Sequence, residues 1–376
     1  MYARQSIDQN DIEAVAQSLK GDVITRGPQV EAFEKGLKEL CEASYCVVMN
    51  SGSSALEAAY FAAEANSADR LITTPNTFIS SIGRGVERGM TPVFIDIDPH
   101  SGNLNLELLK ENLDFQSTRG RLFIVPVHFA GIAVDMKAIS DSIKNPKVII
   151  IEDAAHAIGS YYPSGERVGS CAYSDMTVLS FHPAKVLTTG EGGAVLTNSE
   201  SLYKKLIDFR NNGIHRKSHW EYDCVSYSGN YHMNEMQAAL GVSQLKRLDK
   251  FILKRRALVK RYREKLKGVE GIKLFSDKPD DYTAYHLMVL QIDMNRFAID
   301  RTTLIQKLKE ENIGTQFHYI PLYRHPVLEN AIGDLSSYFP NMEKYYQEAL
   351  SFPLYYDLEL EEVDRIVNTL KRILKI

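Results

Sequence analysis

The feature of this sequence that most limits its possible folds is a regular alternation between short β-branched runs and amphipathic segments long enough to form helices. The alternation extends from Tyr45 to about Asn198, and its runs are CVVMN, RLITTP, TPVFIDID, RLFIVPV, KVIIIED, DMTVLSF and GGAVLTN. Parallel strands are buried on both faces and need crossover connections, which are usually helices. The sequence therefore predicts an α/β fold with a mainly parallel, mixed sheet wrapped by helices.

Helical spacing dominates on either side of this region. Before it, one helix is expected to carry Ile12, Val15, Ala16 and Leu19, with Asp8 as its N-cap, and a second to carry Val30, Phe33, Leu37 and Leu40 after Gly27 and Pro28. After it, helices are expected at 199–210, 233–266, 300–311, 341–349 and 361–373, and strands at HLMVLQID and IGTQFHY. We predict a large domain, residues 1–250, and a smaller C-terminal α/β domain, residues 251–376.

Charge and cysteine content argue against several classes of protein. The formal net charge is -4 and no local basic patch stands out, so nucleic acid is not an expected partner. The longest apolar stretch, 147–159, is interrupted by Glu152, Asp153 and His156, and the N-terminus lacks the apolar core of a signal peptide. We expect a cytoplasmic protein without a membrane span. The spacing of the four cysteines predicts free thiols, mostly buried, and no structural metal site.

Two candidate functional features follow strands directly. Asp153 closes the run VIIIED, so its carboxylate is expected at the carboxyl end of a strand, where α/β sheets bind ligands. In isolation such an aspartate is more often a helix cap or a turn residue. The segment NSGSSAL, residues 50–56, places free N–H groups and the hydroxyls of Ser53 and Ser54 at the positive end of a helix, which suits a phosphate. An ordinary serine-rich N-cap explains the same pattern.

Two further features complete the set. Phe78 follows a strand in TPNTFISS, where its ring can cover a flat ligand or simply pack in the core. Lys185 lies between Ala184 and Val186 just after the run DMTVLSF, and no acidic residue precedes Glu191. The turn GEGG that follows is expected to let the backbone approach a ligand closely.

Together these four features describe a site for pyridoxal 5'-phosphate. A lysine forms a Schiff base with the cofactor aldehyde, a carboxylate faces the pyridine nitrogen, and a helix N-terminus holds the phosphate. Lys185 is therefore expected to be desolvated and easier to deprotonate than a free lysine. The motifs GxxxxGK[ST], GxGxxG and HExxH are absent, which lowers the odds of a P-loop enzyme, a dinucleotide enzyme or a zinc protease.

The ordered motifs of the chain resemble the sugar-nucleotide aminotransferases of the DegT/StrS family. The resemblance rests on TRGPQVEAFE, NSGSSAL, TPNTF, VHFAG, EDAAHAIGS, SFHPAK with TTGEGG, SGNYHMNEMQAALGVSQL, HYIPLY and SFPLYYDL. It implies the fold-type I architecture of pyridoxal-phosphate-dependent aminotransferases. SFHPAKVLTTGEGG and HFAG are most similar to the branch that makes 4-amino-4,6-dideoxy-N-acetyl-altrosamine for pseudaminic acid, on a UDP carrier.

The resemblance also implies residue roles around the cofactor. Lys185 would be the Schiff-base lysine, Asp153 would meet the pyridine nitrogen, His156 would lie near the ring oxygen and Phe78 would stack on the ring. The phosphate would be bound at Gly52, Ser53, Ser54 and Ser180, and by Asn230 of the partner subunit, which makes the protein a homodimer with shared active sites. As alternatives, His156 is a hydrogen-bonded core histidine and Asn230 a turn residue.

Substrate contacts are implied for a second set of residues: Tyr2, Asp22, Val23, Ile24, Thr25, His318 and Tyr319. Tyr2 is alternatively a frayed terminal residue, as chain ends commonly are. His232 stands where the family usually has arginine, which questions the ion pair that this arginine makes. Ser53 replaces a common threonine and keeps the hydroxyl.

The implied reaction is a ping-pong transfer of an amino group from L-glutamate to C4 of a 4-keto-6-deoxy nucleotide sugar. Three alternatives remain at this point. A 3-keto sugar aminotransferase would share these motifs. A dehydratase of the same family carries histidine in place of the lysine, so Lys185 argues against it. A non-catalytic pyridoxal-phosphate-binding regulator would keep the fold without turnover, but the complete set of cofactor residues argues against it.

Overall fold

The computed structural model describes residues 1–113, 120–275 and 280–376, and its centre is a seven-stranded sheet. The strands are β1 (Tyr45–Met49), β2 (Arg70–Thr73), β3 (Thr91–Phe94), β4 (Leu122–Ile124), β5 (Val148–Asp153), β6 (Met176–Ser180) and β7 (Gly193–Thr197). Their spatial order is β1-β7-β6-β5-β4-β2-β3. Strand β7 is antiparallel to both neighbours, and the pairs from β6 to β3 are parallel. The prediction of a mainly parallel, mixed sheet is confirmed.

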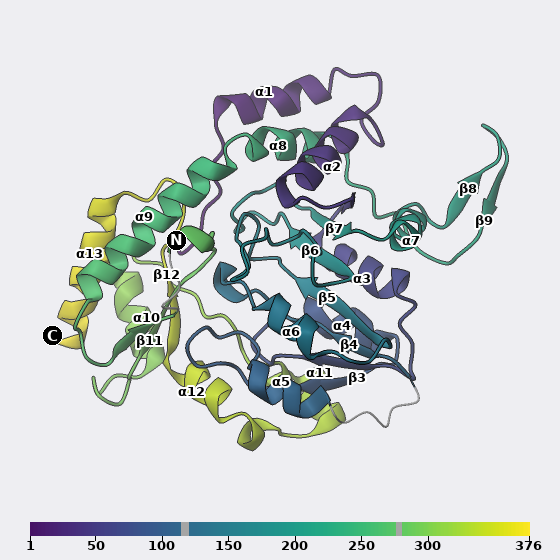
Figure 1. Cartoon of the computed structure of the whole chain (residues 1–376). Coiled ribbons are helices and arrows are strands. Elements are labelled where there is room, and N and C mark those ends of the chain that lie inside the picture. Colours follow the sequence, from purple (N-terminus) through teal and green to yellow (C-terminus); the bar gives the residue numbers. More distant parts are fainter. Residues whose placement is uncertain (114–119, 276–279) are drawn as a thin grey trace.

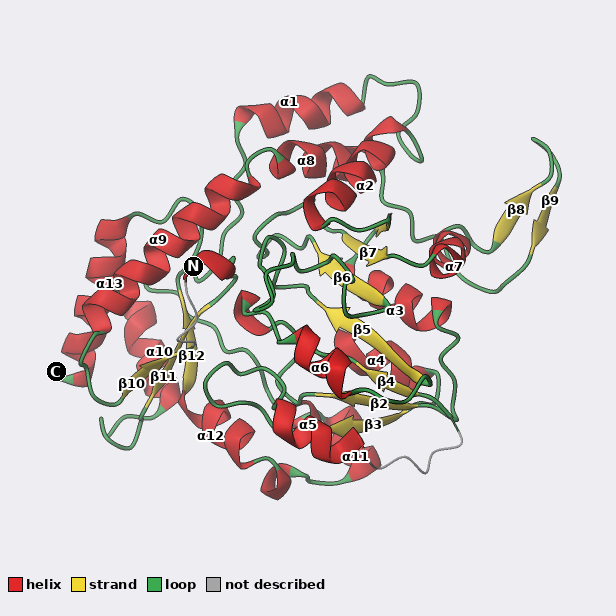
Figure 2. Cartoon of the chain, in the orientation of Figure 1, coloured by secondary structure: helices red, strands yellow, loops and turns green. Residues whose placement is uncertain are grey.

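The continuous apolar runs of these strands are explained by burial on both sheet faces. Alternate residues of a strand point to opposite faces, and two hydrophobic cores divide them accordingly: Val48 belongs to one core, whereas Val47 and Met49 belong to the other. Helices flank the sheet in Figure 2. They are α1 (Gln9–Ser18), α2 (Pro28–Cys41), α3 (Gly52–Ala62), α4 (Ser80–Glu87), α5 (Leu106–Leu113), α6 (Met136–Ser142), α7 (Glu200–Arg210) and α8 (Glu235–Leu245).

The first two helices form where the sequence predicts, but they bury different kinds of residue. Helix α2 begins at Pro28 and buries Val30, Phe33 and Leu37, as expected. Helix α1 has the predicted Asp8 cap, but its Ile12 and Leu19 are exposed. The buried side of α1 is polar instead, because its Asp11 receives hydrogen bonds from α8 and the residues that follow it. The apolar stripe of α1 therefore faces outward in the single chain.

The C-terminal part adds a second, antiparallel sheet with its own core. Its strands and helices are β10 (Ile272–Leu274), β11 (Met288–Ile292), β12 (Ala349–Phe352), α9 (Leu248–Leu266), α10 (Arg301–Glu310), α11 (Pro326–Ile332), α12 (Pro340–Glu348) and α13 (Leu360–Leu374). Helix α9 joins the two parts (Figure 1), since Phe251 packs in the large core and Tyr262 in the small one. The division at residue 250 stays a prediction.

Several predicted elements need correction. The helix expected at 233–266 is two helices, α8 and α9, separated at Lys246 and Arg247. IGTQFHY is not a strand, because its only pairing is an isolated bridge between Gln316 and Ser351. The hairpin of β8 (Ile214–Arg216) and β9 (Tyr222–Cys224) was not predicted, and it projects from the body beyond α7 (Figure 1).

Among the described residues, no helix combines the length and the apolar character needed to cross a membrane. The same part of the chain contains no cluster of three or more histidine, cysteine, aspartate or glutamate side chains suited to a metal ion. The four cysteines are free thiols, as predicted, and only Cys224 is exposed.

Candidate active site

The predicted lysine lies in a cleft of about 610 Å³ at the carboxyl ends of the parallel strands. Lys185 follows β6 in a tight turn, in which its N–H donates to the carbonyl of His182 at 2.8 Å. Burial lowers the pKa of the Lys185 amine to about 8, and the negative charge of Asp153 offsets part of that shift. The prediction of a desolvated, easily deprotonated lysine is confirmed.

Asp153 lies in the same cleft, at the end of β5, and its carboxylate is firmly held. Its Oδ2 accepts a hydrogen bond from Ser81 Oγ at 2.5 Å, and its Oδ1 accepts one from the Ala155 N–H at 3.1 Å. The Ser81 hydroxyl is held in turn by Thr77 at 2.6 Å. These contacts fix the direction of a carboxylate that is 6% exposed. It can therefore face a protonated ring nitrogen without rearrangement.

The N-terminus of α3 forms another wall of the cleft. Ser51, Gly52 and Ser53 line it, and Ser53 Oγ lies 2.8 Å from Ser80 Oγ. The unpaired N–H groups and the positive end of a helix attract phosphate. Ser54 is used differently, since it completes the capping box with Ser51 and its hydroxyl donates to Asn50 Oδ1. The structure thus places Ser54 in the cap and not on the cleft wall.

Two glycines let the surrounding backbone close tightly around this loop. A Cβ at Gly193 would lie 2.3 Å from the carbonyl oxygen of Ser51, and one at Gly52 would lie 2.9 Å from the side chain of Ser180. Neither position accepts a larger residue without moving the loop. Gly193, the last residue of GEGG, thus lets the backbone approach the α3 loop, whereas the approach of GEGG to a ligand stays a prediction. Ser180 also lines the cleft.

His156 is a buried imidazole whose hydrogen bonds define its tautomer. Its Nδ1 accepts from the Ala130 N–H at 3.3 Å, and its Nε2 lies 3.1 Å from Tyr319 Oη. Burial lowers the pKa of His156 well below its usual value, and the charges of Lys185 and His318 lower it further. A neutral imidazole that accepts at Nδ1 carries its proton on Nε2. His156 therefore presents an N–H donor on the cleft side.

The remaining cleft residues from the predicted set, Tyr2, Phe78, His318 and Tyr319, come from distant parts of the sequence. Tyr2 is tied down, because its carbonyl accepts from the Leu354 N–H at 2.9 Å and its ring packs on His318. His318 Nδ1 lies 2.8 Å from Ser351 Oγ, and burial, aided by the charge of Lys185, lowers its pKa to about 3. Phe78 lines the cleft, 57% exposed, with its ring near that of Tyr319.

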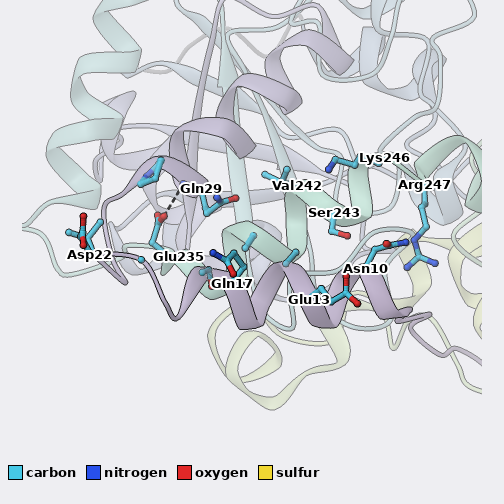
Figure 3. A pocket seen from close by; sticks show the side chains of 16 residues that line it. Asn10, Glu13, Gln17, Asp22, Gln29, Glu235, Val242, Ser243, Lys246 and Arg247 are labelled. Carbon is cyan, nitrogen blue, oxygen red and sulfur yellow. Dashed lines mark hydrogen bonds between the residues drawn. The ribbon is translucent and has the colours of Figure 1, made fainter.

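The other predicted residues lie outside this cleft in the single chain. Asp22 and Val23 line a separate hollow of about 930 Å³ between α1, α2 and α8, in which Glu235 accepts from the Gln29 N–H (Figure 3). Their neighbours Ile24 and Thr25 continue the same exposed loop, and Thr25 forms a bridge with Asn234.

Asn230 also lies apart from the cleft, exposed at the base of the β8–β9 hairpin, where it bridges to Asn211. The nearby His232 also contacts Asn211. Burial, with the charges of Arg26 and Arg210, lowers the pKa of His232 to about 4. Apart from Ser54 in the helix cap, the predicted site residues thus form two groups, one within the cleft and one on exposed loops.

Sequence reasoning missed several residues of the cleft or its support. Ser81 holds the Asp153 carboxylate, and His286 lies against His156 with ring centroids 4.3 Å apart. Glu191 and Gln316 also line the cleft. The only signal for Ser81 was its place in TPNTFISS beside Phe78. His286 gave none, because its contact with His156 joins segments that are distant in the sequence.

A buried lysine of lowered pKa, a fixed carboxylate and a helix N-terminus in one cleft are the parts of a pyridoxal-phosphate-dependent transaminase site. The comparisons with known proteins agree with this class. The profile of the DegT/DnrJ/EryC1/StrS aminotransferase family matches residues 5–371. The chain belongs to this family, its cofactor is pyridoxal 5'-phosphate, and it is a sugar aminotransferase with the fold-type I architecture.

Two relatives and two solved structures illustrate the similarity. The UDP-4-amino-4,6-dideoxy-N-acetyl-beta-L-altrosamine transaminase of Campylobacter jejuni is 33% identical over 100% of this chain and 97% of its own. The spore coat polysaccharide biosynthesis protein SpsC of Bacillus subtilis is 34% identical with the same coverage.

Helicobacter pylori PseC, an aminotransferase of pseudaminic acid biosynthesis, superposes with a TM-score of 0.92 at 28% identity, covering 100% of this chain and 99% of its own. The sugar aminotransferase Spr1654 of Streptococcus pneumoniae, in its pyridoxal-phosphate form, gives 0.90 at 26% identity, covering 100% and 98%.

Proposed function

We propose that this protein transfers an amino group from L-glutamate to C4 of a 4-keto-6-deoxy nucleotide sugar, with a UDP-linked N-acetyl sugar as acceptor. The observation that carries the transaminase part is the Lys185 amine, which shares a buried cleft with Asp153 and has a pKa of about 8. The sugar part is supported by the names of the relatives in Campylobacter jejuni and Helicobacter pylori, which are transaminases of a UDP-linked amino sugar.

Lys185 is suited to act both as nucleophile and as proton carrier. At pH 7, an amine of pKa about 8 is unprotonated in roughly one molecule in ten, against roughly one in 3,000 for an ordinary lysine. When bound, pyridoxal phosphate supplies an aldehyde for the amine and a ring that takes up electrons. Once the amino group of glutamate has replaced it at the aldehyde carbon, the freed Lys185 Nζ would accept the proton from the α carbon of glutamate and would return it to the carbon that had carried the aldehyde.

The neighbouring side chains hold the cofactor rather than move protons. Asp153, fixed by Ser81, would keep the pyridine nitrogen protonated. The N–H on Nε2 of His156 would donate to the ring oxygen, in place of its contact with Tyr319. The N-terminus of α3, with Ser53 and Ser180, would bind the phosphate. Phe78 offers a ring face at the cleft mouth.

We also propose a homodimer in which each cleft receives residues from the partner subunit. The β8–β9 hairpin projects from the body and exposes Trp220, Tyr222 and Tyr227, although an isolated two-stranded hairpin is marginally stable in water (Figure 1). Exposed aromatic surface of this kind favours a protein interface. In this arrangement Asn230 and the loop 22–25 reach the other subunit's cleft. A cytoplasmic location stays a prediction from the sequence.

The alternative functions make different demands on the site. A 3-keto sugar acceptor fits the same cofactor residues, so only the product distinguishes it. A non-catalytic regulator would not need a lysine amine whose pKa is lowered to about 8 in a cleft with a fixed carboxylate. This lowered pKa disfavours the regulator hypothesis.

The test is a mass-spectrometric screen of UDP-, dTDP- and GDP-linked 4-keto and 3-keto sugars with glutamate, followed by NMR of the aminated product. Amination of the UDP-linked sugar at C4 is expected. A product aminated at C3, or turnover of only another nucleotide, would overturn the proposed acceptor and leave the transaminase class intact. No turnover of any of these sugars, with glutamate or with other amino acids as donor, would favour the regulator.

A further inference from the structure

A buried arginine outside the cofactor cleft is connected to His156 through a series of hydrogen bonds. Arg255 lies on α9, 2% exposed, and no carboxylate among the described residues pairs with it. Its Nη1 instead donates to the carbonyls of Tyr285 and His286, each at 3.3 Å, and of Leu354 at 3.1 Å. Its Nε has no partner in the described part of the chain. Burial lowers the pKa of Arg255 to about 10, so its charge is held at a free-energy cost.

Two of the three carbonyls that Arg255 holds, those of Tyr285 and His286, belong to the segment that positions the turn beside His156. The His286 N–H donates to the Ala130 carbonyl at 2.9 Å, and the Ala130 N–H donates to His156 Nδ1 at 3.3 Å. Ala130 has a positive φ of 56°, an uncommon conformation for a residue other than glycine. A Cβ at Gly131 would lie within 3.1 Å of the His156 carbonyl and the His286 N–H. The turn is therefore closely packed between the two histidines.

The side chains of this region also favour a neutral His156. The His286 ring lies 4.3 Å from the His156 ring. In addition to burial, Lys185 and His318 lower the pKa of both rings, and Arg255 lowers the pKa of His286. Arg255 thus contributes both hydrogen bonds to the segment and a positive charge behind it.

We propose that Arg255 is a positioning residue for transamination: by holding the 285–286 segment against Ala130, it keeps the Ala130 N–H on His156 Nδ1 and the imidazole proton on Nε2. That N–H is the group that can donate to the ring oxygen of the cofactor. The inference rests on the transaminase class and not on which sugar is the acceptor. Arg255 itself does not reach the substrate; it acts through His286 and Ala130.

The neighbouring residue on the same helix supplies a matched control. Arg256 also ties α9 to the loop before β11, since its Nε and Nη2 donate to the carbonyls of Thr283 and Asp281. It contacts neither residue 285 nor residue 286 through a described hydrogen bond. Arg256→Met therefore removes a guanidinium and two hydrogen bonds from the same helix, but it leaves the hydrogen bonds that position the Ala130 turn in place.

The experiment compares Arg255→Met, Arg255→Lys and Arg256→Met in the full-length protein, with and without pyridoxal phosphate. The His156 imidazole is followed by ¹⁵N NMR of histidine-labelled protein, assigned with His156→Asn. The kcat and the KM for glutamate are measured in steady-state transamination with the acceptor found in the screen described above. Arg255→Met is expected to shift the His156 signals away from the Nε2-protonated form and to lower kcat about 10- to 100-fold. Arg255→Lys should recover part of both effects, and Arg256→Met should show neither.

Unchanged His156 signals in folded Arg255→Met would overturn the proposal, as would a loss of thermal stability with normal kcat per folded molecule. If Arg255→Met does not fold, Ser160→Ala decides the question. The Ser160 hydroxyl donates to the Gly131 carbonyl at 2.7 Å and accepts from the Ala284 N–H at 2.9 Å, so it ties the same turn to the same segment. A smaller shift of the His156 signals is expected there, and no shift would contradict the proposal.

Discussion

The cleft around Lys185 and the projecting β8–β9 hairpin are built in opposite ways. Lys185 and Asp153 lie at the ends of buried strands, and the described contacts to them come from within one chain. The hairpin exposes Trp220, Tyr222 and Tyr227 and pairs only with itself. The Lys185–Asp153 part of the proposed site is therefore determined by the fold of one subunit, whereas the contributions proposed for Asn230 and the loop 22–25 require a second subunit.

The largest expected effect concerns the cleft. Lys185→Ala removes the nucleophile and the proton carrier together, so kcat should fall about 10⁴-fold or more. The variant should keep the mass of the wild-type assembly, because Lys185 lines the cleft and is not part of the hairpin. Steady-state transamination and light scattering check both points. Robust turnover by this variant would refute the role of Lys185.

A second variant tests the carboxylate. Asp153→Asn keeps the shape but removes the charge that would face the pyridine nitrogen, and kcat is expected to fall about 10²- to 10³-fold. Ser81→Ala, which removes the 2.5 Å hydrogen bond to Asp153 and the contact with Thr77 but keeps the carboxylate, should cost about 1 kcal/mol, or several-fold in kcat. Presteady-state kinetics of the glutamate half-reaction measure both. Equal rates for Asp153→Asn and wild type would contradict the assignment.

A substitution in the β8–β9 hairpin should instead weaken the dimer and leave the attachment of the cofactor intact. Tyr222→Asp introduces a charge into the proposed interface, and loss of an aromatic anchor typically costs about 2 kcal/mol, roughly 30-fold in the dimer Kd. We expect more monomer in sedimentation velocity and a raised KM for the nucleotide sugar, with cofactor still attached to Lys185. A variant that stays dimeric with an unchanged KM would place the interface elsewhere.

The smallest effect is on the pH dependence of stability. The pKa of buried His318 is about 3, below that of an unfolded histidine, so below about pH 6.5 the unfolded chain binds a proton that the folded protein does not. The unfolding free energy should therefore fall with acidification, and His318→Asn should reduce that slope by about 1.4 kcal/mol per pH unit between pH 6 and 4. Denaturant titrations measure it, with the exposed His100→Asn as control. Identical slopes in both variants would contradict burial of His318.

The contrast between the cleft and the hairpin also explains which features the sequence could predict. The seven strands from Tyr45 to Thr197 were recognisable because burial on both faces leaves continuous apolar runs. Asp153 and Lys185 were recognisable because ligands collect where such strands end. Local pattern was enough for these features, and the structure places them together as expected.

Features set by distant contacts could not be predicted in this way. The three-residue strands β8, β9 and β10 are too short to show a period. The sequence IGTQFHY is typical of a strand, but the segment forms a single isolated bridge, and its residues from Gln316 onward line the cleft. Helix α1 shows an apolar stripe although its polar side, with Asp11, is the one that is buried. The links from Ser81 to Asp153 and from Arg255 to His286 join remote segments and leave no local signal.

The proposed function depends most on Lys185 being the residue that holds the cofactor covalently. Reduction of the pyridoxal-phosphate-loaded protein with borohydride, followed by proteolysis and mass spectrometry, tests it directly. We predict a pyridoxyl-phosphate mass increment on the peptide that contains Lys185 and on no other lysine. An increment on a different lysine, or none after loading, would contradict the account.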